Sequence, residues 1–345
     1  MLTLRLEADR LLLDPRDVDT LVPGVVEVRA PAITQVGGRI LVACDARTTP
    51  VHTDWERIGG AMAADLPNPN SLLLLRDGEP EVLRRGVLEP QTGFSDPSFV
   101  SDGERVVLFH ARSADVGFFG SVPWRDDAAR DTLHVELGVS DDFGATWEFS
   151  TITGDVAVEY AGVFATSGHG IVVDDVWLQP AVARCADGST RHVTWRSTDR
   201  GRSWCPGQPC GSDCDESAIE TVGESLVMSA RSTTAYRSGR LGRWWSTSRD
   251  LGRSWEPVRW ASIPAAAACN ATLVHAPCGL LLVYAAQGRI GGRIAVHRRG
   301  GWQEFAELGP DEPFGYADAL WHGEHLHIVY ESAGSLRYAL FSVPS

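Results

Sequence analysis

The sequence predicts an all-β protein, a six-bladed β-propeller that fills residues 1–345 as a single domain. Three observations favour this fold class: short runs that alternate apolar and polar residues, a turn motif that occurs three times, and the spacing of its copies. The alternation is clear in 134–139 and 191–195, and no long segment repeats apolar residues at helical spacing. With 43% apolar and 22% charged residues, the chain has enough hydrophobic side chains for a large core.

The repeated turn has the pattern Ser-x-Asp-x-Gly-x-Ser/Thr-Trp and occupies residues 140–147, 197–204 and 248–255. In a β-hairpin, the aspartate can accept hydrogen bonds from N–H groups of the turn, the glycine supplies a positive φ, and the tryptophan packs back over the turn. Each copy therefore predicts a corner between two strands. The aspartates lie 57 and 51 residues apart, which is the length of one four-stranded propeller blade.

The remaining blades follow from the same spacing. Weaker copies of the turn occur at 76–78 and 298–302, in phase with the three complete copies. A period of this length divides the chain into six or seven blades, and we expect six. We also expect the N-terminal and C-terminal strands to pair and close the ring, because closure leaves little exposed sheet edge.

Charge and hydropathy exclude several classes of protein. The formal net charge of −14 argues against a nucleic-acid binder, because contacts with phosphate need a basic surface. The longest apolar run, about 280–286, is far shorter than the roughly 20 residues of a membrane-spanning helix. Charged residues among the first ten interrupt the apolar segment that a signal peptide needs. We therefore expect a cytoplasmic protein, secreted only if a signal was removed upstream, and the sequence leaves its oligomeric state open.

Two groups of residues have side chains that can ligate metals. Cys205, Cys210 and Cys214 have the spacing C-x4-C-x3-C, but the sequence offers no fourth ligand at a standard zinc spacing. His325 and His327 follow a Gly-Glu pair, which predicts a hairpin turn with both histidines on one face of a strand. We expect no metal and no cofactor, and we interpret all seven cysteines as reduced thiols.

The three complete turns resemble the Asp boxes of sialidases, also called neuraminidases, which other propellers carry as well. An Asp box alone indicates a folding corner and says nothing about activity. From about Val26 to Phe341, however, further segments resemble motifs of the bacterial exo-sialidases of glycoside hydrolase family 33, in the same order. These segments are 28–32 (Val-Arg-Ala-Pro-Ala), 65–71, 93–98, 116–121, 215–217 (Asp-Glu-Ser), 228–231, 289–294 (Arg-Ile-Gly-Gly-Arg-Ile), 315–320 and 329–331.

The resemblance implies three catalytic residues. Tyr316 corresponds to the nucleophile of the family, Glu216 to the base that takes its proton, and Asp65 to the acid/base that serves the leaving oxygen and then water. Asp54 competes with Asp65, because the stretch from Thr48 to Ala64 is longer than the usual connection of the family. Two displacements on one face of the sugar would give net retention.

The resemblance also implies a set of substrate-binding residues. They are Arg29, Arg231 and Arg289 for a carboxylate, Glu331 to brace Arg29, Arg47 and Asp96 near a ring hydroxyl, and Phe118 as a wall near the acyl group. A sialoside carries a carboxylate on its reacting carbon, and arginine offers a planar, permanently charged donor pair that lysine cannot reproduce. The same carboxylate would repel a carboxylate nucleophile but not a neutral tyrosine.

Several alternatives stay open. Ala30 stands where isoleucine is usual, and the inserted stretch, with His52, Trp55 and Arg57, is expected to overhang the cleft, so Kdn or Kdo could replace N-acetylneuraminic acid as the sugar acid. A trans-sialidase would need an aromatic acceptor platform, for which Trp55 or Trp124 is available. A non-catalytic glycan-binding propeller would keep the arginines, but it predicts the loss of a catalytic residue, and all three are present. The expected partner is thus a sialoglycan or another nonulosonic or octulosonic acid glycoside.

Overall fold

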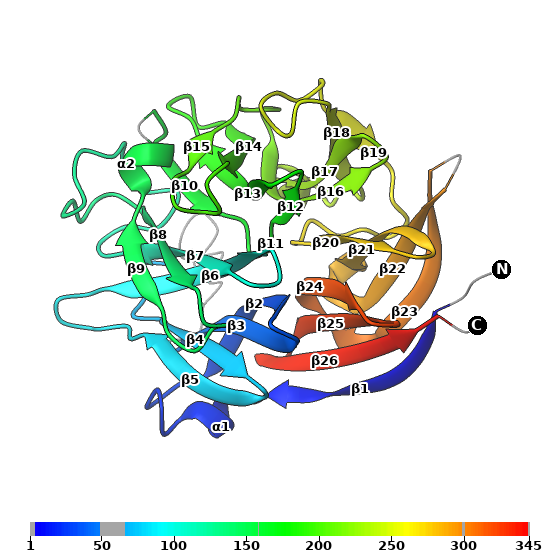
Figure 1. Cartoon of the computed structure of the whole chain (residues 1–345), viewed down its shortest axis with the longest axis horizontal. Coiled ribbons are helices and arrows are strands. Elements are labelled where there is room, and N and C mark those ends of the chain that lie inside the picture. The colour runs from blue at the N-terminus through cyan, green and yellow to red at the C-terminus, as the bar shows by residue number, and fades with distance from the viewer. Residues whose placement is uncertain (1–3, 49–65, 158, 299–300, 344–345) are drawn as a thin grey trace.

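Six sheets surround a central axis in the computed structural model of the protein, and Figure 1 shows them as the blades of a propeller. The structure describes residues 4–48, 66–157, 159–298 and 301–343. Each sheet has four antiparallel strands, which run in chain order from the axis outward except that β1 is the outer strand of the last blade; the second and third sheets each have one further short strand. The predicted six-bladed propeller is confirmed.

The strands are assigned to blades in chain order, as follows. Blade 1 contains β2 (Glu27–Val36), β3 (Arg39–Arg47), β4 (Ser71–Arg76) and β5 (Glu79–Arg84). Blade 2 contains β6 (Gly93–Ser101), β7 (Val106–Ser113), β8 (His134–Ser140) and β9 (Glu148–Thr151), with β11 (Gly168–His169) beside β6. Blade 3 contains β10 (Gly162–Ala165), β13 (Val176–Arg184), β14 (Thr190–Ser197) and β15 (Cys205–Pro206), with β12 (Ile171–Val173) on β13.

The second half of the ring is more regular. Blade 4 contains β16 (Cys214–Val222), β17 (Ser225–Ser232), β18 (Arg243–Ser248) and β19 (Arg259–Ala261). Blade 5 contains β20 (Thr272–Ala276), β21 (Gly279–Ala285), β22 (Ile290–Arg298) and β23 (Gly301–Pro313), and blade 6 contains β24 (Gly315–His322), β25 (His325–Ser332), β26 (Ser335–Ser342) and β1 (Arg5–Leu13). The helices are short: α1 (Pro15–Val18), α2 (Thr153–Val156), α3 (Ala235–Ser238) and the 3-10 helix η1 (Gln287–Arg289).

The first strand of the chain closes the ring. β1 pairs with β26 in antiparallel register, with Arg5 opposite Ser342 and Leu13 opposite Leu336. The first and last strands of the chain, β1 and β26, therefore lie side by side in Figure 1. This pairing confirms the predicted closure and gives blade 6 its outer strand from the N-terminus.

The hydrophobic core lies mainly between the blades. Buried side chains in the described ranges form six main clusters, and each cluster joins a pair of neighbouring blades around the ring. In the cluster between blades 2 and 3, Phe109 contacts Trp195 and Trp204 at ring-centroid distances of 5.6 and 4.8 Å. Because every blade is buried on both faces, the ring leaves only its outer strands and its two ends to solvent.

The three Asp boxes join the third strand of a blade to its outer strand, as the motif predicts. In the first box, the Asp142 carboxylate accepts hydrogen bonds from Thr146 N at 2.8 Å and from Thr146 Oγ1 at 2.6 Å. These bonds lower the pKa of Asp142 to about 2. The weaker copies join the corresponding strands of blades 1 and 5, where Asp77 and Gly78 have positive φ.

The Asp-box glycines also pack against the preceding blade. An added Cβ atom would lie 2.6–2.7 Å from a side-chain atom there: from Leu41 at Gly144, from Val107 at Gly201 and from Thr194 at Gly252. The residue before each glycine reaches the same neighbour, since Phe143 covers Gly37 and Arg200 forms an ion pair with Asp102. Each box therefore holds two blades together as well as turning the chain.

Replacement of Gly201 by Ala is expected to lower the free energy of unfolding by about 2–4 kcal/mol, because a positive φ and an interblade clash add. The position has φ +79° and faces Val107. Gly188 is a matched control, since it has φ +81° and nothing within 4 Å of an added Cβ. Gly188→Ala should cost only about 1–2 kcal/mol. Denaturant unfolding measures both, and equal losses would contradict the packing role.

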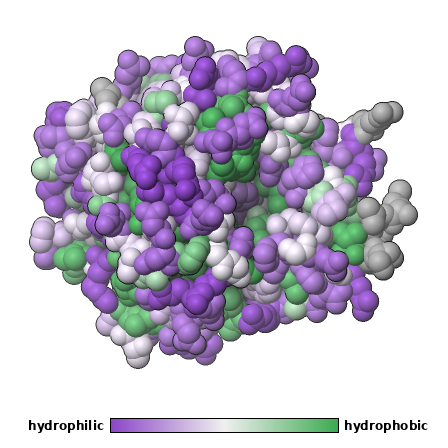
Figure 2. Space-filling view, viewed as in Figure 1, coloured by the Kyte–Doolittle hydropathy of each residue, from purple (hydrophilic) through white to green (hydrophobic). Residues whose placement is uncertain are grey.

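Polar residues cover most of the face seen in Figure 2, with small apolar patches between them. None of the helices in the described ranges has the length and hydrophobicity of a membrane-spanning segment. All seven cysteines are free thiols, of which Cys205 is exposed and Cys210 and Cys214 are buried. The predicted hairpin at 322–325 joins β24 to β25, with His322 opposite His325.

Candidate active site

The inner ends of four blades bring together most of the residues expected to be functional. Arg29 lies on β2, Glu216 on β16, Arg231 on β17 and Tyr316 on β24, and Arg289 ends η1. Several pairs of these elements, such as β16 and β24, are more than 70 residues apart in the sequence. Only ring closure places them around one axis. Strands that start at the axis are buried on both sides, which fixes the side chains at their ends.

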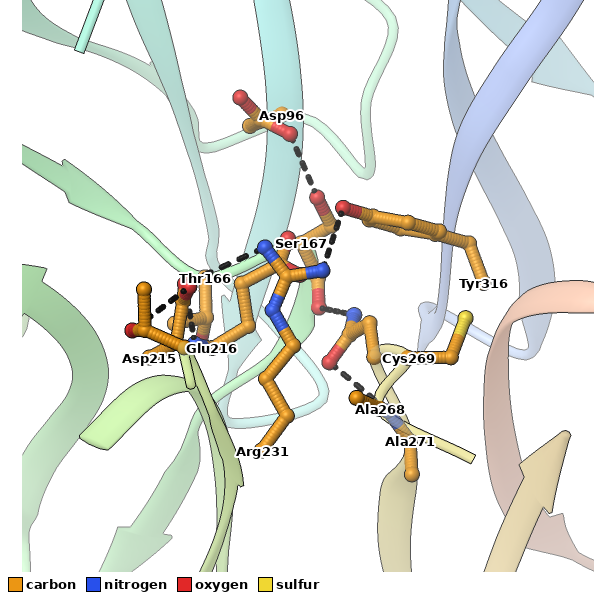
Figure 3. A network of polar contacts seen from close by, with 12 residues as sticks. Asp96, Thr166, Ser167, Asp215, Glu216, Arg231, Ala268, Cys269, Ala271 and Tyr316 are labelled. Carbon is orange, nitrogen blue, oxygen red and sulfur yellow. Dashed lines mark hydrogen bonds and ion pairs between the residues drawn. The ribbon is translucent and has the colours of Figure 1, made fainter. Parts of the chain in front are cut away.

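Arg231 is the centre of the closest contacts, shown in Figure 3. Its Nη1 lies 2.9 Å from Glu216 Oε2 and 3.4 Å from Tyr316 Oη, and its Nη2 lies 3.2 Å from Asp215 Oδ1. All four side chains are at least nine-tenths buried. One guanidinium therefore joins the predicted nucleophile to the predicted base.

Two carboxylates keep this arginine charged. Burial opposes the charge on Arg231, but Asp215 and Glu216 outweigh it and hold the pKa of Arg231 well above its usual value. Asp215 is itself fixed, because its Oδ1 accepts from Glu216 N at 2.8 Å and its Oδ2 accepts from Thr233 Oγ1 at 3.2 Å. The result is a rigid, charged group whose donors point into the centre of the ring.

Arg29 and Arg289 line a common cavity. Arg29 Nη2 lies 3.1 Å from Glu331 Oε2, and Glu331 Oε1 accepts from Ala30 N at 2.6 Å, so Glu331 holds both the side chain and the strand. Ala30 has φ +50° at a bulge in β2. Arg29, Arg289 and Glu331 line a cavity of about 170 Å³ between blades 1, 5 and 6.

Arg289 is anchored from blade 5. Its Nη2 donates to Ala268 O at 3.4 Å, and its backbone has φ +56° at the end of η1. The adjacent Cys269 sulfur and Tyr316 raise the pKa of Arg289 against the effect of burial. The structure thus brings the three predicted arginines to one end of the axis, on three different blades.

Arg47 and Asp96 lie at the blade 1 and blade 2 side. Arg47 is 1% exposed and donates from Nε to Asp45 Oδ2 at 2.8 Å, and the same oxygen accepts from Ser95 Oγ at 2.8 Å. Asp96, the next residue, has φ +57° and accepts from Ser167 Oγ at 2.9 Å. A left-handed aspartate at a strand bulge turns its carboxylate away from the sheet and toward the axis.

Phe118 lies further out, on the loop after β7. Its ring packs edge-on against Phe164 and Phe119 at centroid distances of 5.0 and 5.1 Å, and its carbonyl oxygen accepts from Arg184 Nε at 3.0 Å. These contacts fix the loop to blade 3. They do not connect Phe118 to Arg29, Arg231 or Arg289.

The predicted acid/base Asp65, its competitor Asp54 and the inserted stretch 48–64, apart from Thr48, lie outside the described residues. The chain that follows Asp65 is firmly packed. Leu66 and Asn70 are 4% and 0% exposed, and an added Cβ at Gly93 would lie 1.6 Å from Asn68 O. The segment after Asp65 is therefore held against the start of β6.

Sequence reasoning missed a fourth arginine behind this site. Arg243 is completely buried, and it donates from Nε to Ser229 Oγ at 2.8 Å and from Nη1 to Cys269 O at 2.7 Å. Burial lowers its pKa to about 10. The sequence carries no signal for it, because an arginine at the start of a strand is most often a surface charge.

A buried histidine supports the strand of Glu216. His192 Nδ1 is 2.7 Å from Ser217 Oγ and Nε2 is 2.9 Å from Thr194 Oγ1, with no exposure to solvent. Burial lowers the pKa of His192 to about 3, against 6.5 in an unfolded chain. Between these two values the unfolded chain binds one more proton, so the protein should lose stability as the pH falls.

The expected loss for this one group is about 1.4 kcal/mol per pH unit between pH 6.5 and 3. His192→Gln should remove that part of the slope in urea unfolding measured across this range. His275→Gln, at an exposed position on β20, is the control. An identical slope in both variants would show that His192 binds protons normally in the folded state.

No group of three or more His, Cys, Asp or Glu side chains within the described ranges is placed to hold a metal ion. His325 and His327 are half-buried on β25, and His327 Nδ1 lies 2.6 Å from Tyr338 Oη.

Comparison with known proteins gives one relative of significant sequence similarity and many of similar fold. A curated sialidase of Micromonospora viridifaciens is 32% identical to this chain over an alignment of 253 residues, and the match covers 68% of this chain and 37% of that protein. The chain thus spans little more than a third of the length of the curated relative it matches. No family model matches the chain.

Among solved structures, the Hadza microbial sialidase Hz136 has a TM-score of 0.78 at 19% identity, covering 96% of this chain and 68% of its own. Trypanosoma rangeli sialidase in complex with the inhibitor DANA has a TM-score of 0.70 at 14% identity, covering 92% and 55%. The K499G mutant of NanB sialidase from Streptococcus pneumoniae has a TM-score of 0.68 at 13% identity, covering 91% and 68%.

The fold is therefore the six-bladed propeller of sialidases, with an arginine-lined site at one end of its axis. On the sequence match, the chain belongs to the sialidase family.

Proposed function

We propose that this protein is a retaining exo-glycosidase that hydrolyses terminal, α-ketosidically linked sialic acid through a tyrosyl-enzyme intermediate. The observation that carries the proposal is the contact of a single Arg231 nitrogen with both Glu216 and Tyr316. Arg29 and Arg289 line a cavity next to this cluster. The arrangement offers a cationic site for a sugar carboxylate beside a nucleophile and a base.

Substrate binding would use the three arginines. The sialic acid carboxylate would replace part of the contact that Arg231 makes with the protein's own carboxylate, and it would receive further donors from Arg29 and Arg289. Glu331 keeps Arg29 in place for this, with its second oxygen on Ala30 N. Because the anomeric carbon is bonded to that carboxylate, binding brings it next to Tyr316.

In the first step, Tyr316 Oη attacks the anomeric carbon and its proton passes to Glu216, while the glycosidic bond breaks and Asp65 gives a proton to the leaving oxygen. In the second step, Asp65 takes a proton from water, the water oxygen attacks the anomeric carbon, and Tyr316 leaves and recovers its proton from Glu216. Two inversions at one carbon give net retention.

Descriptions of solved relatives support this chemistry. Trypanosoma rangeli sialidase was captured with 2,3-difluorosialic acid as a covalent intermediate, and other structures of it hold sialic acid or the inhibitor DANA. Those structures share the fold of this chain at 13–14% identity, so they support the proposal by analogy.

The nature of the sugar acid is part of the proposal. Ala30 lies at the bulge beside Arg29 and stands where the family usually has isoleucine, so Kdn or Kdo glycosides are alternative substrates. Trypanosoma rangeli sialidase also has a structure with 2,3-difluoro-KDN. A cytoplasmic location stays a prediction.

Transfer to another glycan is an alternative to hydrolysis. A mutant of Trypanosoma rangeli sialidase displays trans-sialidase activity. Of the two tryptophans proposed as an acceptor platform, Trp55 lies outside the described residues. Trp124 packs on Gly154 of α2, and its Nε1 donates to Asp127 Oδ1 at 3.0 Å. Trp124 is thus held by blade 2, which weakens its case as a platform.

A panel of 4-methylumbelliferyl glycosides of N-acetylneuraminic acid, Kdn and Kdo tests the proposal on the wild-type chain. Release from the first glycoside, with the α-anomer as the first product by NMR, supports a retaining exo-sialidase. Release from Kdn or Kdo alone would keep the mechanism and change the substrate. Silence across the panel, with binding of the sugar acids by calorimetry, would overturn the enzyme in favour of a glycan-binding propeller.

Replacing the acid/base should affect natural substrates far more than activated ones. Asp65→Ala is expected to lower kcat about 100-fold or more on 3′-sialyllactose and much less on the methylumbelliferyl glycoside, because a good leaving group needs no proton. Asp54→Ala is the matched control and should keep wild-type rates on both. The reverse pattern in the two variants would assign the acid/base to Asp54.

A further inference from the structure

A short segment between β10 and β13 fills the axis of the propeller beneath the candidate site. We call this segment, Thr166–Gly170, the axial segment. Its residues Gly168 and His169 form β11, which pairs in parallel with Ser98 and Phe99 at the inner edge of blade 2. It is the one parallel pairing among the strands that the structure describes. Thr166 and Ser167 are 1% and 6% exposed.

The axial segment contacts the strand of each predicted catalytic residue in the described ranges. Thr166 Oγ1 donates to the carbonyl oxygen of Ser217 at 2.7 Å, directly after Glu216. His169 Nδ1 lies 2.6 Å from Asp318 Oδ1, two residues after Tyr316. The contact of Thr166 is buried and that of His169 is half-buried. Both are made with residues near the axis and not at the rim.

The middle of the segment reaches two more blades. Ser167 Oγ donates to Asp96 Oδ1 at 2.9 Å, and Ser167 O accepts from Asn270 Nδ2 at 2.8 Å. Asn270 follows Cys269, which lies beside Arg231 and Arg289, and Figure 3 shows this chain of contacts around Ser167. Five consecutive residues between β10 and β13 therefore contact blades 2, 4, 5 and 6.

Asp318 extends the network to the remaining blade. Its carboxylate is fully buried and accepts from Ile33 N of β2 at 2.8 Å and from Thr272 Oγ1 of β20 at 3.0 Å, besides its contact with His169. Burial opposes a charge on His169, but Asp318 outweighs it and raises the pKa of His169. The pair is thus a charge-assisted contact below that raised pKa.

The position of the segment matters because Glu216 and Tyr316 lie on blades that are not neighbours. Blade 5 separates blades 4 and 6, so packing between adjacent blades sets the distance from base to nucleophile through two interfaces in series, and Arg231 adds one direct contact with Tyr316. The axial segment spans the axis directly, from Ser217 to Asp318. A proton transfer between two side chains is steeply sensitive to that distance.

We propose that the axial segment is a positioning element for the reaction, in which Thr166 and His169 hold Glu216 and Tyr316 at their working separation. The inference rests on the proposed function, and it goes beyond it by assigning roles to residues that touch neither the sugar nor the reacting atoms. Thr166 acts through the Ser217 carbonyl group, and His169 acts through Asp318.

Three variants test it on the full chain with the methylumbelliferyl glycoside of N-acetylneuraminic acid. Thr166→Val keeps the shape and removes the hydroxyl donor, His169→Ala removes the contact with Asp318, and His169→Gln keeps a donor on a similar side chain. Ser246→Ala is the matched control, since it removes a buried hydroxyl that donates to Glu256 O at 2.5 Å at the rim of blade 4.

We expect kcat to fall about 10- to 100-fold in Thr166→Val and His169→Ala with KM within about threefold of wild type, since misplacement alters chemistry more than binding. His169→Gln should recover most of the loss, and Ser246→Ala should keep wild-type kcat. In the double variant that combines Thr166→Val with His169→Ala, kcat should fall by less than the product of the two single-variant factors, as expected for residues that act as one unit.

Equal kcat in Thr166→Val, His169→Ala and Ser246→Ala, with only their melting temperatures lowered, would overturn the positioning role and leave the proposed function intact. An inactive wild type would instead overturn the proposed function, before any variant is compared. The KM-to-kcat split and the rescue by glutamine separate positioning from general loss of stability.

Discussion

Tyr316→Phe is expected to abolish hydrolysis of the methylumbelliferyl glycoside of N-acetylneuraminic acid, with kcat lower by on the order of 10³-fold or more. The substitution removes a single oxygen, the atom that we propose attacks the anomeric carbon. Tyr316 is 7% exposed, and its ring packs in the core between blades 5 and 6, so phenylalanine should keep the fold. Initial rates and circular dichroism on the same samples measure the two effects.

Tyr338→Phe is the matched control. Tyr338 lies on β26, its hydroxyl is 2.6 Å from His327 Nδ1 on β25, and it contacts none of Arg29, Arg231 and Arg289, so the change should leave kcat and KM unchanged. Tyr316→Phe should still bind the inhibitor DANA by calorimetry, because Arg29, Arg231 and Arg289 remain. Retention of more than a tenth of the wild-type kcat in Tyr316→Phe would exclude this tyrosine as the nucleophile.

Arg231→Lys is expected to lower kcat/KM about 100-fold, which is roughly 3 kcal/mol of transition-state stabilisation. Lysine keeps the charge but has one compact donor group, whereas the guanidinium contacts Glu216, Tyr316 and Asp215 from two nitrogens. The two carboxylates that hold Arg231 would then compete for a single ammonium. Both kcat and KM should change, since the residue serves the sugar carboxylate and the catalytic pair.

Arg76→Lys tests whether any arginine-to-lysine change has this effect. Arg76 lies on β4, donates to Gly144 O at 3.1 Å and pairs with Glu81 at 3.2 Å, far from the axis. It should keep the wild-type kcat/KM. Arg231→Lys with unchanged kinetics would mean that only the positive charge is needed at this position, and that the planar guanidinium with its two donor nitrogens is not required.

The fold could be predicted because its repeating unit is local. The hydrogen bonds of each complete Asp box connect residues within one stretch of eight, as Ser203 and Asp199 do. The motif is therefore visible in a short window of the sequence. The period between boxes then sets the blade length. What the pattern cannot show is that the glycine of each box is also packed against the blade before it, as Gly201 is against Val107.

The site was predicted in part, and the reason lies in what the family motifs contain. Arg231, Glu216 and Tyr316 were found by motif and do meet in the structure, although their roles stay predictions. Arg243 and the axial segment were missed, because each acts through backbone groups or through other side chains and carries no pattern of residue types. Thr166 and His169 read as ordinary loop residues in the sequence.

By itself, the sequence determined the all-β class, the number of blades and the positions of the turns, and its family resemblance predicts the residue types of a carboxylate-binding site. Only the tertiary structure decided which oxygen meets which nitrogen, because that depends on the closing of a ring by β1 and β26 and on the segment that fills its axis. Local hydrogen bonds and hydrophobic alternation are encoded over a few residues. The separation between Glu216 and Tyr316 depends on contacts between residues that are far apart in the sequence, in one case by more than 100 positions. No short motif encodes such contacts.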